Sequence, residues 1–414
     1  MARNNYFRVR DGPVILNKIH KYGKVQNLMS YISLNTLMDK HKQLSRNKAT
    51  GIDNITKNIY DKNLEQNLDN LLNRMKRLEY YPLPARRTFI PKSNGKLRAL
   101  GIPSYEDKLV QGVMADILSV IYEPIFLDCS FGFRPNRNCH EALKTLNNII
   151  TNNTNYVVET DIKSFFDNVN HQYLLTFISR TIKDKRFVTY IERFLKSGVM
   201  QNGQKLKTKR GTPQGGLISP ILANIYLHYV LDEWFENNIK AKYNNCFLIR
   251  YCDDFIACFQ NIDEARLFFE GLQLRFKEYD LELETSKTKI VNLNNTSLSE
   301  SLDFLGFTIS KFPNESNYNG LSFITSNKKL QSKKDDINNL IKKHRHSNNM
   351  TSLINQLNLK LKGFYNYYNV YTNQHCLKEI YNYTLQQLQN ILNFDVNKSN
   401  LSLVKPNVSN SKSL

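Results

Sequence analysis

The sequence predicts an α+β fold in which strands of an antiparallel sheet precede an α-helical C-terminal region. Two strand-like apolar runs flank Tyr251-Cys252-Asp253-Asp254, which is the pattern of two buried strands joined by a tight turn. A second hairpin is indicated over 86–103, where the turn dipeptide Asn94-Gly95 separates two extended runs. From Leu321 onward, apolar residues recur at helical spacing, and 13 Lys and Arg stand against 4 Asp and Glu.

The charge of the chain favours a polyanionic partner. Its 57 Lys and Arg against 37 Asp and Glu give a net charge of +20, and such an excess binds polyanions through counterion release. A membrane surface is the competing explanation, but no apolar run could cross a bilayer, and no secretory or lipidation signal is found. The six cysteines lack C-x-x-C spacing, which predicts free thiols in a reducing cytoplasm. We therefore expect a cytoplasmic protein that binds nucleic acid and no membrane.

Changes of pattern along the chain predict five segments. A basic arm, 1–24, precedes a helical region, 25–85, which ends near two prolines. The sheet-forming segment is expected over 86–312, and the helical C-terminal domain over 313–396. The last residues, 397–414, are rich in Ser, Asn and Lys, and we expect them to be disordered.

Three aspartates follow strand-like runs. Asp161 ends an apolar run, and Asp253 and Asp254 sit at the bend of the hairpin. Buried carboxylates are costly unless a cation compensates them, and Mg²⁺ is a hard ion that takes carboxylate oxygens. A strand ending in an acid, a helical insertion and then an Asp-Asp hairpin is the layout of a palm that holds two Mg²⁺ for phosphoryl transfer. Taken singly, an acid at such a position more often caps a strand or forms a solvated turn, so the metal site is expected from the three acids jointly.

With its motifs in this order, the chain resembles the reverse transcriptases of the bacterial group II intron (maturase) type, in the form without a C-terminal nuclease domain. The matching stretches are 86–103, 131–143, 156–167, 211–220, 251–254, 285–289, 304–307 and 361–368. The resemblance implies a right-hand polymerase with fingers, an α+β palm and a helical thumb or maturase domain. It implies RNA-templated addition of dNTPs to a DNA primer, with structured intron RNA as a further partner.

The resemblance also assigns the metal and nucleotide sites. Two Mg²⁺ ions, with Mn²⁺ as a substitute, would be held by Asp161, Ile162, Asp253 and Asp254. Lys287 corresponds to the lysine that protonates the leaving pyrophosphate, with nearby Lys289 as the alternative.

Four further residues are implied to bind the incoming nucleotide. Lys92 and Arg98 would clamp its phosphates. Phe166 would lie under the sugar, where its ring excludes a 2′-hydroxyl, although a core aromatic is the alternative. The amide of Gln214 would hydrogen-bond the nucleotide or the template.

The remaining assignments concern the template, the primer and RNA. The residues expected at the template and primer are Arg134, Arg137, Gly215, Gly216, Phe304, Leu305 and Gly306. The two arginines of this set either touch the template or stabilise the palm, and 304–307 is either a primer grip or ordinary sheet core. The residues expected to bind RNA on the thumb are Lys342, Lys343, Arg345, Lys362, Tyr365, Tyr367 and Tyr368. A basic helical face with exposed tyrosines suits structured RNA, while a solvated helix end is the alternative.

The match departs from many intron-encoded proteins after the thumb. Only 397–414 follows it, which argues against endonuclease activity. One alternative function is therefore a domesticated reverse transcriptase in phage defence or CRISPR spacer acquisition. The chain could also be a splicing cofactor that only binds RNA, or an RNA-dependent RNA polymerase. The sequence does not determine the oligomeric state.

Overall fold

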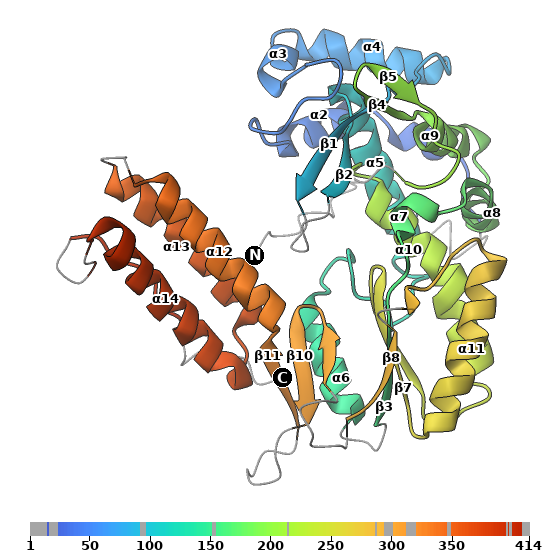
Figure 1. Cartoon of the computed structure of the whole chain (residues 1–414). Helices are drawn as coiled ribbons and strands as arrows, with labels where there is room; N and C mark the ends of the chain where they lie inside the picture. The colour runs from blue at the N-terminus through green and yellow to red at the C-terminus, as the bar shows by residue number, and fades with distance from the viewer. Residues whose placement is uncertain are drawn as a thin grey trace.

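The computed structural model describes residues 15, 24–91, 97–150, 155–212, 215–285, 288–293, 301–311, 320–345, 349–394, 396 and 400–407 (Figure 1). Three residues assigned above, Lys92, Gln214 and Lys287, lie outside the described residues. So do nearly all of the N-terminal arm and most of the C-terminal tail. No helix among the described residues is long and apolar enough to cross a membrane.

The central sheet, which we call the palm sheet, has four antiparallel strands in the order β6-β7-β3-β8. Their bounds are β3 Tyr156–Thr160, β6 Phe247–Tyr251, β7 Asp254–Phe259 and β8 Lys289–Asn292. Side chains alternate between its two faces, as strand geometry requires. Val158 and Phe255 pack into the core beneath α11 (Ile262–Glu278), whereas Val157 and Ile256 pack into the core that holds α6 (Cys139–Ile150). The sheet is therefore buried on both faces, between α6 and α11 (Figure 1).

A second sheet has the order β2-β1-β4-β5, and we call this sheet with its surrounding helices the fingers. Its strands are β1 Ala85–Pro91, β2 Leu97–Ile102, β4 Val199–Gln201 and β5 Gln204–Leu206. The β1–β2 pair confirms the hairpin expected over 86–103, with Ile90 opposite Arg98. The surrounding helices are η1 Leu28–Tyr31, α2 Leu34–Gln43, α3 Lys57–Asp61, α4 Leu64–Lys76, α5 Tyr105–Tyr122, α7 Phe165–Asn168, α8 His171–Thr181 and α9 Lys185–Lys196.

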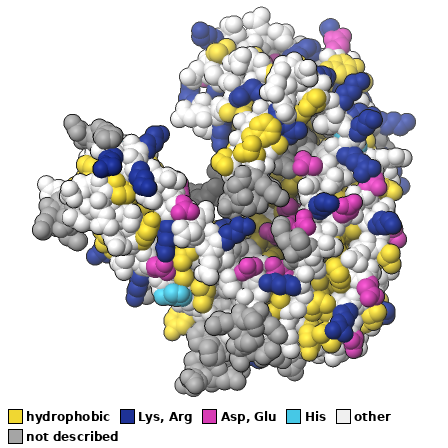
Figure 2. All heavy atoms as spheres, in the orientation of Figure 1, with side chains coloured by type: hydrophobic (Ala, Val, Ile, Leu, Met, Phe, Trp, Pro, Cys, Tyr) yellow, Lys and Arg dark blue, Asp and Glu magenta, His cyan; other side chains and the backbone are white. Residues whose placement is uncertain are grey.

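The C-terminal region is a short sheet followed by three long helices. The strands are β9 Leu302–Phe304, β10 Phe307–Lys311 and β11 Leu321–Thr325, in the antiparallel order β11-β10-β9. The helices are α12 Asn327–Lys343, α13 Met350–Tyr368 and α14 Gln374–Leu392, with the short η5 Tyr371–Asn373 before the last. These helices form a bundle, which we call the thumb. It stands apart from the fingers, and an open cleft separates the two in the space-filling view (Figures 1 and 2).

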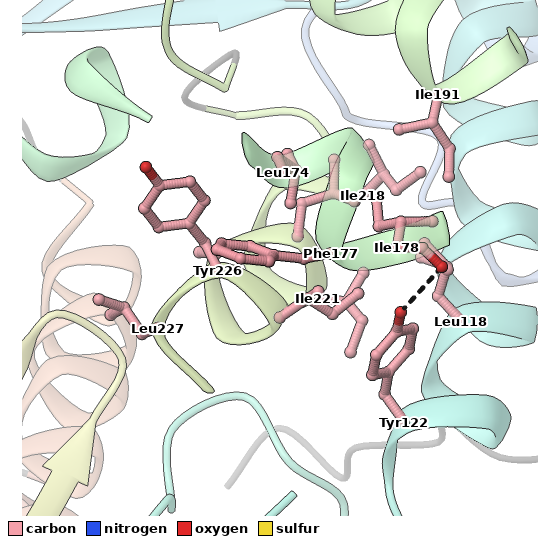
Figure 3. Close-up of a cluster of buried hydrophobic side chains, with 14 of the residues drawn as sticks. Leu118, Tyr122, Leu174, Phe177, Ile178, Ile191, Ile218, Ile221, Tyr226 and Leu227 are labelled. Atoms are coloured by element: carbon pink, nitrogen blue, oxygen red, sulfur yellow. Dashed lines mark hydrogen bonds between the residues drawn. The ribbon is translucent and has the colours of Figure 1, made fainter. Parts of the chain in front are cut away.

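A helical core joins the fingers to the palm. It brings α5, α8 and α9 against α10 (Ser219–Leu227), which continues into two π-helical turns, η2 His228–Asp232 and η3 Phe235–Ile239. Figure 3 shows the side chains of this cluster, among them Leu118, Phe177 and Ile221, and the hydroxyl of Tyr122 that donates to the carbonyl of Ile178. This packing holds the start of α10 in a fixed position relative to the palm sheet.

Candidate active site

The Asp-Asp hairpin forms as the apolar flanks predict. Tyr251 pairs with Asp254, so Cys252 and Asp253 are the two turn residues between β6 and β7. Cys252 has a positive φ of 62°, which two-residue hairpin turns require at their first central position. Its thiol is buried, Asp253 is half-buried and Asp254 is exposed.

Asp161 lies beside this turn. The last pair of the β3–β7 ladder is Thr160 opposite Phe255, so the next step of the same register puts Asp161 opposite Asp254. Directly opposed residues of antiparallel strands project to the same face of the sheet. Burial raises the pKa of Asp253, and the nearby charge of Asp161 raises it further. The structure therefore brings the predicted carboxylates together at one end of the palm sheet.

The gathered groups fit a hard divalent cation. No three His, Cys, Asp or Glu side chains in the described parts of the chain are close enough to hold a metal by themselves. Mg²⁺, however, is commonly held by one or two carboxylates together with water and substrate phosphates rather than by a protein cage. Burial and the charge of Asp161 both disfavour the ionised form of Asp253. A bound cation would offset the cost of burial and the repulsion between the two carboxylates, so the site suits such an ion.

The backbone next to Asp161 offers a further oxygen. The carbonyl of Asp161 accepts from the amide of Glu284 (2.8 Å), and the amide of Lys163 donates to Glu282 (2.9 Å). Backbone groups alternate sides along an extended chain, so the carbonyl of Ile162 faces away from 282–284. This orientation agrees with a metal-binding role for Ile162.

A buried arginine holds the turn from behind. Arg250, at 0% exposure, donates to both carboxylate oxygens of Asp232 (2.7 and 2.5 Å), to Asn224 (2.9 Å) and to Ser130 (2.8 Å). It also donates to the carbonyl oxygen of Cys252 (3.0 Å), one residue before Asp253. Sequence reasoning missed this group. The available signal was an arginine in an otherwise apolar run immediately before the acids.

The block 131–137 packs against the same turn. A Cβ on Gly132 would lie 2.5 Å from the backbone nitrogen of Cys252, so only glycine permits this approach. Asn224 donates to the carbonyl of Gly132 (2.8 Å) and accepts from Arg250, which links the block to the buried arginine.

The two arginines of this block are both bound to groups within the protein. Arg134 is 4% exposed and is bound to Glu123 and to the carbonyls of Leu127 and Ser130. Its assignment to the template is therefore corrected, because its donors are engaged inside the protein. Arg137 pairs with Asp128 and lies over the ring of Phe131.

Two of the nucleotide-binding assignments, Arg98 and Phe166, fall on described elements. Arg98 is exposed on β2, and its charge lowers the pKa of Asp253, so the fingers hairpin comes within electrostatic range of the turn. Phe166 is half-buried on α7, with its ring edge-on to Phe165. The backbone of Phe166 accepts from the amide of Thr212 (2.7 Å), which ties it to the loop before α10.

The glycines of that loop allow the backbone to approach other parts of the protein. Gly215 has a φ of 107°, and a Cβ there would lie 2.7 Å from the carbonyl of Gly101 on β2. Gly216 is buried, and its carbonyl accepts from Ser219 (3.2 Å) at the start of α10. The loop therefore connects the fingers sheet to the helical core.

The hairpin expected to grip the primer is held by the thumb. Leu305 and Gly306 both have positive φ, 51° and 81°, as a type I′ turn requires. The hydroxyl of Tyr367 donates to the carbonyl of Leu305 (2.9 Å). Phe304 and Phe307 are buried, so their side chains are sheet core and only the turn is available to a primer.

The thumb assignments divide by exposure. Lys342, Lys343, Arg345 and Lys362 are exposed, and Tyr367 is 37% exposed. The expectation of exposed tyrosines is wrong for Tyr365 and Tyr368, which are 6% and 7% exposed. They share a helical face with Leu361, and this face of α13 packs into the core.

Comparison with known proteins agrees with this geometry. The family model described as reverse transcriptase (RNA-dependent DNA polymerase) matches residues 90–309. The model described as group II intron, maturase-specific domain, matches residues 330–400.

Two curated relatives cover different shares of the chain. The group II intron-encoded protein LtrA of Lactococcus lactis subsp. cremoris is 43% identical over 205 residues, which are 49% of this chain and 34% of LtrA. The protein YkfC of Escherichia coli is 34% identical over 283 residues, which are 59% of this chain and 73% of YkfC. The chain thus spans about a third of LtrA. A solved telomerase from Candida albicans, with a fragment of telomeric RNA, aligns at a TM-score of 0.45 and 15% identity, over 82% of this chain and 64% of that one.

Proposed function

The chain belongs to the reverse transcriptase family, and from this membership we propose that it copies RNA into DNA by extending a DNA primer with dNTPs. The observation that supports this most directly is the gathering of Asp161 and Asp253 at the hairpin turn, with Arg98 within electrostatic range. Two carboxylates with a guanidinium within electrostatic range suit a metal-bound triphosphate.

In the proposed reaction, Asp161, Asp253, Asp254 and the carbonyl of Ile162 hold two Mg²⁺ ions, for which Mn²⁺ is a substitute. When bound, the ions supply activation of the primer hydroxyl and charge stabilisation at the leaving pyrophosphate. The protein itself orients the acids through the turn and excludes bulk water from Asp253 by partial burial.

Other residues bind and select the nucleotide. Arg98, together with Lys92, binds the phosphates, and the ring of Phe166 excludes a 2′-hydroxyl. Lys287 donates a proton to the pyrophosphate. The alternative, Lys289, is less suitable, because its Nζ is held by Glu159 (3.2 Å) and by the carbonyl of Ser301 (2.8 Å).

An Asp253→Asn variant tests the polymerase. We expect primer extension on an RNA template to fall by about 10³-fold, because one metal ligand supplies several kcal/mol of transition-state stabilisation. Asp263→Asn is the matched control, since Asp263 is an acid with 82% of its side chain exposed on α11. Near-normal extension by Asp253→Asn, with unchanged thermal unfolding, would contradict the proposal.

We further propose that the chain binds structured RNA, and that this RNA is the group II intron whose splicing and retrohoming it supports. The match to the maturase-specific domain, the net charge of +20 and the exposed basic residues of α12 and α13 support this second role. The six cysteines are free, and free thiols suit the cytoplasmic location that we propose.

Sequencing the RNA that co-purifies from the native host tests this role. A dominant structured RNA that spans the gene supports an intron partner. A separate small noncoding RNA or a diffuse set of transcripts contradicts it, and favours a domesticated reverse transcriptase. If Asp253→Asn still supports splicing and the wild type extends no primer, the chain is a splicing cofactor only.

A further inference from the structure

A large open groove lies outside the active site, between α8, α9 and the segment that continues β5. Its volume is about 1060 Å³, and we call it the basic groove because six of its lining residues are cationic. These are Arg180, Lys183, Lys196, Lys205, Lys207 and Lys209, and Glu192 is the acid among the described lining residues. All six cationic residues are exposed.

Most of this positive charge is not compensated within the protein. Lys196 pairs with Glu192 (2.5 Å), and Arg180 approaches Glu233 at 3.8 Å. Within the described ranges, no ion pair is formed by the other four lysines of the groove. A concave surface with this much unpaired charge focuses a positive potential and attracts a polyanion.

Three lysines of one wall follow one another closely along the chain. Lys205 is the middle residue of β5, and Lys207 and Lys209 follow at alternate positions in the segment after it. Between these two, the hydroxyl of Thr208 donates to the carbonyl of Leu195 on α9 (2.8 Å). The wall is thus a row of cations whose backbone is fixed to a helix.

The chemistry of the lining selects among polyanions. Unpaired bases are usually bound by stacking on exposed aromatic rings, whereas duplex RNA is bound through phosphates and 2′-hydroxyls. Among the described lining residues the one ring is that of His171, which is buried and bonded to the carbonyl of Gly211 (2.7 Å). Hydroxyl and amide side chains, including Gln172, Thr176 and Ser179, line the groove instead.

We propose that the basic groove binds the phosphate backbone of duplex RNA, separately from the template and primer. The groove lies beside α8 and α9, on the side of the molecule away from α12 to α14, and Lys and Arg side chains gather along that edge (Figures 1 and 2). The proposal rests on the proposed binding of structured RNA and gives that RNA a second contact surface besides the thumb.

The test compares two variants of equal charge change. One is Lys205→Gln/Lys207→Gln/Lys209→Gln, and the control is Lys62→Gln/Lys76→Gln/Lys277→Gln, three exposed lysines outside the groove. The probe is a fluorescent RNA hairpin with a duplex stem of about 24 base pairs, longer than the roughly 16 base pairs that a double-stranded RNA-binding domain spans. It is added to full-length protein already holding an RNA–DNA template–primer. Its dissociation constant is measured from about 50 to about 200 mM salt.

Each phosphate contact contributes about 0.9 to the slope of log affinity against log salt. Loss of three contacts should lower the slope by about 2.7. Between about 50 and about 200 mM salt, the affinity of the wild type should therefore fall by a factor about 40 times larger than that of the groove variant. The control should keep the wild-type slope, and the groove variant should extend primers normally. A DNA hairpin of the same sequence should bind more weakly.

Equal slopes for the two variants would overturn the proposal, as would equal affinity for the DNA hairpin. A parallel loss of primer extension in the groove variant would overturn the separation from the template path. Because the readout is binding, the comparison can be repeated in Asp253→Asn protein, and its outcome does not depend on polymerase activity.

Discussion

Replacing Arg250 separates the stability of the palm from the positioning of Asp253. In Arg250→Met, the carboxylate of Asp232 stays fully buried without its cation. Breaking a buried ion pair in this way costs about 3–5 kcal/mol, a large part of the roughly 5–15 kcal/mol that stabilises a domain. In Arg250→Met/Asp232→Leu both charges are removed, and such double replacements are commonly neutral or stabilising by about 1–4 kcal/mol. We therefore expect the double variant to recover the loss due to the unpaired carboxylate, but not the hydrogen bonds of Arg250 to Asn224 and Ser130.

The double variant should nevertheless remain a poor polymerase. It lacks the hydrogen bond to the carbonyl of Cys252 (3.0 Å), so nothing in this cluster fixes the residue before Asp253. A displacement of about 1 Å at a reacting centre costs about 10²-fold in rate. We expect single-nucleotide extension to fall by about that factor, with the Mg²⁺ concentration for half-maximal rate raised.

Urea unfolding and Mg²⁺-dependent extension together provide the assay. Arg275→Met is the control, because Arg275 donates to the carbonyls of Tyr229 and Val230 but not to the turn. It should leave the Mg²⁺ dependence unchanged. Wild-type extension at wild-type Mg²⁺ concentration by the double variant would refute the positioning role of Arg250.

Three further predictions concern other parts of the molecule. Burial raises the pKa of Asp107 from 3.8 to about 6, so the folded state binds a proton more tightly than the unfolded state. Stability should therefore decrease by about 3 kcal/mol as pH rises from about 4 to above 6, and urea unfolding of Asp107→Asn should lack this decrease. Phe166→Ala should lower the preference for dNTPs over rNTPs by roughly 10–100-fold in kcat/KM; an unchanged preference would make Phe166 a core aromatic. Gly306→Ala should lower thermal stability and primer affinity, because φ is 81° and the new Cβ would lie 2.7 Å from the hydroxyl of Tyr368. The expected loss of stability is about 1–2 kcal/mol. Wild-type stability and wild-type primer affinity would show that the turn adapts to the new side chain without cost.

Local patterns predicted the hairpins well. Both 86–103 and the strands around Asp253 combine extended apolar runs with a short turn, and those signals are contained within a few residues. The helical region was predicted less completely. Ile59 lies within the helical region expected over 25–85, yet this apolar residue is 51% exposed, and the chain leaves helical geometry soon after it, between α3 and α4.

Contacts distant in sequence could not be predicted. Asp232 lies on the π-helical turn η2, 18 residues before Arg250. A pairing between residues this far apart produces no periodic pattern in the sequence. The burial of Tyr365 and Tyr368 was missed for a related reason. A tyrosine is compatible with either the solvent-exposed or the buried face of an amphipathic helix. The tertiary packing of α13 determines which face Tyr365 and Tyr368 occupy.

Tyr367 of α13 is hydrogen-bonded to two other parts of the chain. Its hydroxyl is bound to the turn of the β9–β10 hairpin, and its carbonyl is bound to His140 of α6 in the palm (2.7 Å). The amide of Ser326, just before α12, is also bound to the turn, at Gly306 (3.0 Å). Because Tyr367 and Ser326 both bind the hairpin turn, the turn and the helical bundle would move together as one body against α6. Opening of the bundle would therefore tilt the turn that is expected to grip the primer by the same rotation.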